Sequence, residues 1–125
     1  MKTTVSFVQN LIRLTWLVLL VLGIVLWTGH APGLVLAHQL AGIGFVLLLW
    51  VLGYLGLRSD ATRGLALANC IWGLVVLTLG AAQTQLLSGN LHWIVRVLHL
   101  LVGIAGIGLA EALAGRIRRR LASRE

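Results

Sequence analysis

The sequence predicts an all-α integral membrane protein in which residues 1–125 form one domain, an up-down bundle of four transmembrane helices. Of its 125 residues, 59% are hydrophobic and 10% are charged, and the mean hydropathy is +0.99, which excludes an ordinary water-soluble domain. A bilayer core of about 30 Å needs roughly 20 apolar residues per helix. Four segments close to that length are present, approximately at residues 11–28, 34–57, 64–87 and 91–115. The linkers are short, so neighbouring helices are expected to be antiparallel.

The positive charges predict the orientation of this bundle. The net charge is +7, and the cations flank the first helix, occupy the 58–63 loop and follow the last helix (Lys2, Arg13, Arg58, Arg63, Arg116, Arg118, Arg119, Arg120 and Arg124). The loops on the opposite side contain no Lys or Arg. The positive-inside rule therefore places both termini in the cytoplasm, with the helices in the inner (plasma) membrane of a prokaryote. We expect the basic tail to contact anionic membrane lipid and not nucleic acid.

The first two segments carry small and polar residues at helical spacing. Gly23 lies on a stripe that continues to His30 in steps of four and three residues. Pro32 follows in a short connection, where proline fits a turn or the first position of a helix. The second segment then places His38 and Gly42 one turn apart, on the same face.

The last two segments repeat this spacing. The stripe of the third segment contains Asn69, Gly73, Val76, Gly80 and Gln83. The stripe of the fourth segment is the most polar and contains His92, Arg96, His99, Gly103, Gly106 and Ala110. A polar line on an apolar helix faces protein, water or a cofactor. Stripes of this kind on all four helices predict a left-handed bundle with the stripes turned inward.

The two halves of the chain resemble each other. The residues from His38 to Gly44 and from His99 to Ala105 share the pattern H-x-L-[A/V]-G-I-[G/A]. Because both halves start on the same side of the membrane, the repeat is parallel and has a pseudo-twofold axis along the membrane normal. Such an axis brings His38 and His99 to opposite sides of one central site.

The two histidines predict a heme site. At 1.5 Å per residue, His38 lies about 6–8 Å and His99 about 12 Å below the outer ends of their helices. Four glycines lie near the same level (Gly23, Gly42, Gly80 and Gly103). Glycine lets a flat group approach the backbone, and imidazole is a common ligand of heme iron. We expect one heme b with His38 and His99 as its two axial ligands.

The heme propionates would need hydrogen-bond donors near the outer rim. Arg96 lies one turn outward of His99, and a guanidinium matches a carboxylate well. His92, and either Gln83 or His30, are expected to add hydrogen bonds there.

The residues in the inner half of the bundle predict a packed core there and not a second heme site. It contains no histidine, and Trp16, Trp50 and Trp72 occupy that depth as core or lipid-facing side chains. Asn69 and Glu111 are expected to pair with each other or with arginines.

Together these residues resemble one half of a heme A synthase, whose four-helix halves each carry a histidine on the second and fourth helices, as His38 and His99 do here. The chain resembles other small bis-histidine membrane cytochromes b to the same degree. The resemblance spans nearly the whole chain and implies the heme-holding architecture. The chain departs from the catalytic half of that family at Val35, where the family has Glu, at Gln39, where it usually has Arg, and in lacking the outer-loop cysteine pair.

We expect the protein to transfer electrons near the outer side of the membrane. It would act as an electron carrier and not as an enzyme. Two axial histidines fill both free positions of the iron, which favours electron transfer over oxygen chemistry. We expect the protein to work within a larger redox assembly, with other membrane subunits or as a homo-oligomer. Two alternatives stay open: a heme-modifying enzyme of the heme A synthase type, and a cofactor-free structural subunit whose histidines only pack.

Overall fold

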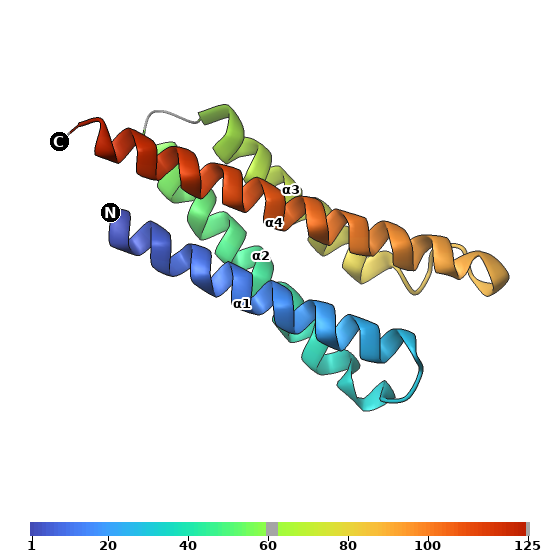
Figure 1. The fold of residues 1–125 in the computed structure, drawn as a ribbon. Coiled ribbons are helices and arrows are strands. Elements are labelled where there is room, and N and C mark those ends of the chain that lie inside the picture. The colour runs from blue at the N-terminus through green and yellow to red at the C-terminus, as the bar shows by residue number, and fades with distance from the viewer. Residues whose placement is uncertain (60–62, 125) are drawn as a thin grey trace.

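The computed structural model describes residues 1–59 and 63–124, which form a bundle of four long helices (Figure 1). The helices are α1 (Lys2–Trp27), α2 (Val35–Arg58), α3 (Arg63–Ala82) and α4 (His92–Ala122), and short 3-10 helices, η1 (Pro32–Leu34) and η2 (Gly89–Leu91), precede α2 and α4. The described residues contain no strand. All four helices are long and apolar enough to cross a membrane, which confirms the predicted all-helical class.

Both chain termini lie at one end of the bundle, which we call the terminal end (Figure 1). The two connections that contain η1 and η2 lie at the opposite end, the turn end. Each helix contacts its neighbour in the chain, α4 returns to contact α1, and α2 also contacts α4 across the bundle. Since α2 and α4 carry the two predicted ligands, this contact across the bundle brings the ligand-bearing helices together.

The helix bounds differ from the hydropathy segments at three places. α1 begins at Lys2 and not near residue 11, and α4 continues to Ala122. Both extensions are amphipathic, with the buried residues Val5 and Val8 in α1 and Ile117 in α4, so they pack together although their other faces are polar. α3 ends at Ala82, because polar residues follow it and the chain turns back towards α4.

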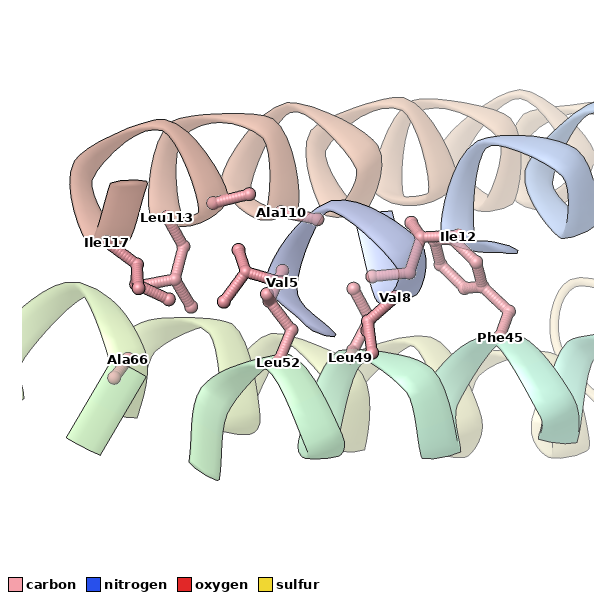
Figure 2. Packing of buried hydrophobic residues seen from close by; sticks show 11 residues of the cluster. Val5, Val8, Ile12, Phe45, Leu49, Leu52, Ala66, Ala110, Leu113 and Ile117 are labelled. Atoms are coloured by element: carbon pink, nitrogen blue, oxygen red, sulfur yellow. The ribbon is translucent and has the colours of Figure 1, made fainter. Parts of the chain in front are cut away.

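The hydrophobic core fills the half of the bundle next to the terminal end. Figure 2 shows side chains of α1, α2 and α4 meeting there, and the core consists of Val5, Val8, Ile12, Phe45, Leu49, Leu52, Ala66, Ala110, Leu113, Ala114 and Ile117. Gly56 lets α2 approach both neighbours, because a Cβ atom there would lie 2.9 Å from Ala66 Cβ and 2.9 Å from Leu113 Cδ1. This half is therefore close-packed.

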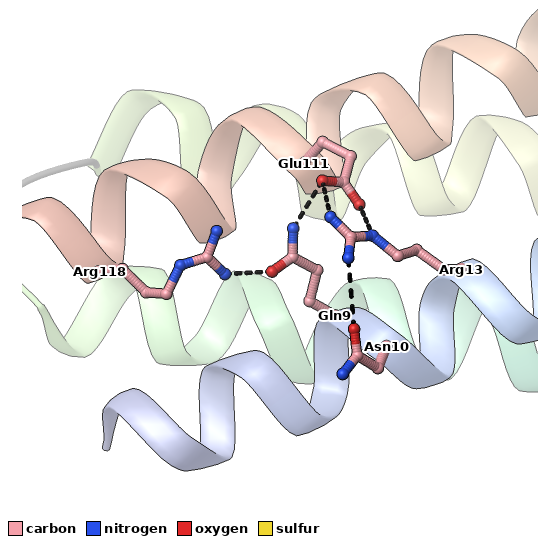
Figure 3. Close-up of polar contacts among 5 residues, drawn as sticks. All are labelled: Gln9, Asn10, Arg13, Glu111 and Arg118. Atoms are coloured by element: carbon pink, nitrogen blue, oxygen red, sulfur yellow. Dashed lines mark hydrogen bonds and ion pairs between the residues drawn. The ribbon is translucent and has the colours of Figure 1, made fainter.

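Polar side chains join the helices in the same half. Glu111 of α4 accepts hydrogen bonds from Arg13 Nε at 2.6 Å, from Arg13 Nη2 at 2.7 Å and from Gln9 Nε2 at 2.6 Å, and Arg118 donates to Gln9 (Figure 3). Glu111 thus contacts an arginine, as predicted. Asn69 does not pair with it but donates from Nδ2 to the Leu49 carbonyl at 2.6 Å.

Two of the inner tryptophans tie neighbouring helices together. Trp50 donates its indole N–H to the Cys70 carbonyl at 3.0 Å, and Trp72 donates to the Val102 carbonyl at 2.9 Å. These bonds link α2 to α3 and α3 to α4, so both rings lie at helix interfaces.

Candidate cofactor cavity between His38 and His99

The half of the bundle next to the turn end is hollow. The buried residues of α1 stop at Ile12, those of α3 stop at Gly73, and those of α2 begin only at Phe45. Beyond them lies a cavity of about 610 Å³ that is lined by residues of all four helices. Small-molecule and cofactor sites typically measure about 300–1,000 Å³, so the cavity has the size of a cofactor site and exceeds the needs of a single metal ion.

His38 and His99 face each other across this cavity. Their ring centroids lie 6.2 Å apart, and the ring planes make an angle of 53°. An imidazole nitrogen binds a metal at about 2 Å, so two imidazoles on opposite sides of one ion have ring centroids about 6 Å apart. The observed separation of 6.2 Å therefore leaves room for a single metal ion between the two rings.

The nitrogen atoms of the two rings have distinct surroundings. In both histidines Nδ1 is buried and has no hydrogen-bond partner among the described residues. Nε2 is not among the buried unpaired atoms, and both rings line the cavity. Nε2 is thus the accessible nitrogen of each ring and the one available as a metal ligand.

Two glycines lie directly against the imidazoles. A Cβ atom added to Gly23 of α1 would lie 3.5 Å from His38 Cε1, and one added to Gly80 of α3 would lie 3.5 Å from His99 Cε1. In each hairpin the first helix therefore supplies the glycine that supports the histidine of the second. A methyl group at either position would be in ordinary van der Waals contact with the ring, whereas a larger side chain would crowd it.

The other two predicted glycines line the cavity without contacting the histidines. A Cβ atom on Gly42 would lie 4.0 Å from Leu19 Cδ2, and one on Gly103 would lie 3.9 Å from Trp16 Nε1. Both positions thus face side chains of α1, and they shape the wall of the cavity one turn below the histidines.

The predicted rim residues divide into two groups. Arg96, His92 and Gln83 line the cavity. Arg96 is exposed and has no ionic partner within residues 1–59 and 63–124, and His92 Nδ1 lies 3.3 Å from the Leu86 carbonyl. His30 is exposed in the turn after α1 and is not part of the lining. The structure therefore gathers a guanidinium, an imidazole and an amide at one edge of the cavity.

The floor of the cavity contains a residue whose place there the sequence did not reveal. Trp16, expected as inner filler, lines the cavity together with Phe45 and Val46. Its indole N–H has no hydrogen-bond partner among the described residues, unlike those of Trp50 and Trp72. Trp16 lies on the same helical stripe as Gly23, and that spacing was the signal for its position.

The described residues contain no cluster of three or more His, Cys, Asp or Glu side chains suited to holding a metal ion. The donor set at this site is the facing pair His38 and His99 alone. No protein-family model, curated protein or solved structure matches the chain. The functional assignment therefore rests on the geometry of the cavity.

Proposed function

We propose that this protein is a membrane cytochrome b that binds one heme b between His38 and His99 and transfers electrons near one face of the membrane. The observation that carries the proposal is the pair of imidazoles with centroids 6.2 Å apart inside a cavity of about 610 Å³. Together these features match the ligands and the space that a heme needs. Gly23 and Gly80, which leave room beside the imidazoles, support it further.

The chain's own residues would perform three tasks. His38 and His99 would both hold the heme iron, and with two imidazoles bound the iron would have no site left for oxygen. Leu19, Phe45 and the other apolar residues of the wall exclude water. Arg96 and Gln83 offer donors to carboxylates at the rim. A bound heme supplies a centre that accepts and releases one electron.

The orientation in the membrane belongs to the same proposal. Both termini lie at the terminal end (Figure 1), so Lys2 near the N-terminus and the arginines of the C-terminal tail belong to that end. The positive-inside rule puts that end in the cytoplasm of a prokaryotic cell. The cavity is then near the outer face of the inner membrane.

The matched contacts in the two hairpins support an internal repeat. Gly23 lies against His38 as Gly80 lies against His99, at the same distance of 3.5 Å. We propose a parallel repeat with a pseudo-twofold axis between the two histidines.

The packed half of the bundle bears on how electrons move. Ile12, Phe45 and Leu113 are fully or almost fully buried there, and they fill the space that a second heme would need. One heme near the outer face does not carry electrons across a bilayer of about 30 Å. The proposed role therefore requires donor and acceptor on the outer side, or partner subunits that complete the path.

The test is the pigment of the purified protein. Protein made in heme-replete cells should be red, with a bis-imidazole absorption spectrum that changes on reduction. Extraction and mass analysis should identify one unmodified heme b per chain. A colourless protein from such cells would contradict the proposal and favour a structural subunit, and a modified heme would favour the heme-modifying alternative.

A further inference from the structure

The two candidate ligands share an unusual feature at one ring nitrogen, Nδ1. A metal-bound histidine ordinarily donates its second ring N–H to a carboxylate, a backbone carbonyl or water. In both His38 and His99, Nδ1 is buried and finds no acceptor among the described residues. The first helix of each hairpin carries a glycine near the ring: a Cβ atom on Gly23 would lie 3.5 Å from His38 Cε1, and one on Gly80 would lie 3.5 Å from His99 Cε1, the carbon bonded to Nδ1.

This feature matters because the second ring nitrogen tunes the ligand. An acceptor at Nδ1–H draws the proton away and gives the imidazole more negative character, which makes it a stronger ligand. A stronger, more negative ligand stabilises ferric over ferrous iron. An imidazole without such an acceptor stays neutral and stabilises the ferrous form by comparison.

We infer that His38 and His99 act as a pair of neutral imidazole ligands without hydrogen-bond support, and that this arrangement raises the reduction potential of the site. The inference rests on the proposed heme-binding function. Two further features act in the same direction: the apolar cavity wall disfavours the additional positive charge of ferric iron, and Arg96 places a cation at the rim.

The inference specifies the class of redox partner. A site that favours its reduced form takes electrons readily from its donor and passes them on only to a stronger oxidant. The partner that accepts electrons from this protein is therefore a centre of still higher potential on the outer side.

The glycines beside the imidazoles provide a matched test. Replacing Gly23 with Ala adds a methyl group at 3.5 Å from the His38 ring, an ordinary van der Waals distance. Gly23→Ser adds the same carbon and a hydroxyl oxygen. Because that carbon lies 3.5 Å from Cε1, which is bonded to Nδ1, the hydroxyl is placed to accept from Nδ1–H, and its own proton can go to the carbonyl one turn back. Gly80→Ser and Gly80→Ala make the corresponding pair beside His99. The difference between Ser and Ala isolates the hydrogen bond from the change in volume.

The measurement is the midpoint potential of each holoprotein in detergent, followed by its absorption spectrum. Each Ser variant should have a lower potential than its Ala partner, and the double Ser variant should be lower than either single variant. Equal potentials for Ser and Ala at both positions would overturn the inference. The heme content of the same samples tests the proposed function separately, because the inference can fail while heme binding persists.

A second measurement uses the unaltered chain, so that the inference can be tested even if the variants fold poorly. Pulsed electron paramagnetic resonance of the ferric protein reports hydrogen bonding through the quadrupole coupling of the remote nitrogen of each ligand. Couplings typical of an unbonded Nδ1–H are expected for both histidines. Couplings typical of a strong hydrogen bond at either histidine would contradict the inference.

Discussion

The imidazole rings of His38 and His99 lie with their centroids 6.2 Å apart, on helices that are not consecutive in the chain. The two helices, α2 and α4, also contact each other directly. A Cβ atom on Gly106 of α4 would lie 3.4 Å from Phe45 Cε1 of α2, so this glycine allows the close approach of the two helices. The distance between the candidate ligands thus follows from packing in the core.

Removal of either candidate ligand should reduce heme binding. His38→Ala and His99→Ala each leave one imidazole, and we expect the heme content of the purified protein to fall at least severalfold. The remaining bound heme should lose the bis-imidazole spectrum. Absorbance of the pigment relative to protein provides the measurement.

His92→Ala is the matched control, because His92 lines the cavity while its Nδ1 lies 3.3 Å from the Leu86 carbonyl. It should retain both heme content and spectrum. Equal losses in all three variants would show that the ligand assignment is wrong.

Bulky side chains beside the imidazoles should exclude the macrocycle. Gly23→Leu and Gly80→Leu place a side chain against His38 and His99, respectively, since even a Cβ atom there is already in contact at 3.5 Å. We expect folded but colourless or weakly coloured protein. Gly44→Leu is the control, as a Cβ atom at that position has nothing within 4 Å. Normal pigment in the Gly23 and Gly80 variants would argue against a ligand in this cavity.

Arg96 should influence the heme by its charge. A cation at the rim favours ferrous iron, so Arg96→Gln is expected to lower the midpoint potential without loss of heme ligation. Arg116→Gln, at an exposed position near the terminal end, removes the same charge far from the cavity and should leave the potential unchanged. If both variants behave alike, Arg96 does not act on the bound group.

The packed half should not tolerate an added methyl group. A Cβ atom on Gly56 would lie 2.9 Å from two neighbouring side chains, and one on Gly53 would lie 3.3 Å from the Ala66 carbonyl. Overpacking of a core typically costs about 1–3 kcal/mol, so Gly53→Ala and Gly56→Ala should lower thermal stability. Gly44→Ala should be close to neutral. Unchanged melting temperatures in detergent would contradict the close packing seen here.

The ion pair between Arg13 and Glu111 should contribute less to stability than the close packing around Gly53 and Gly56. The two side chains are 54% and 36% exposed, and pairs of this kind contribute about 0.2–1 kcal/mol. Glu111→Gln should therefore lower the melting temperature only slightly and leave the heme spectrum intact. Reversal of the pair, with Arg13→Glu and Glu111→Arg together, should recover part of the loss.

Much of the fold could be predicted because each helix is both long and apolar. The positions of His38 and His99 on facing helices also followed from the repeated H-x-L-x-G pattern. Hydropathy missed the first turns of α1 and the last turns of α4, because their exposed faces are polar and only Val5, Val8 and Ile117 reveal a buried side. Hydropathy is averaged over a window of consecutive residues, and this average removes the periodic signal of one buried face.

The division of roles within the site was harder to predict. The sequence predicted a common level for all four glycines, yet only Gly23 and Gly80 lie beside the imidazoles, whereas Gly42 and Gly103 face α1. Which face of a helix meets which neighbour depends on rotation and on the contact between α2 and α4 across the bundle. Spacing within one helix carries no information on that rotation.

The division of the bundle into a packed half and a hollow half has a consequence for maturation. Because the buried core and the polar contacts of Glu111 lie near the terminal end, the four helices have a folding unit that needs no cofactor. We expect slow amide hydrogen exchange around Leu49 and Leu113 in protein made without heme, and fast exchange around Gly23 and His38. Insertion of heme would then be a late event, in which an already assembled bundle becomes rigid at its turn end.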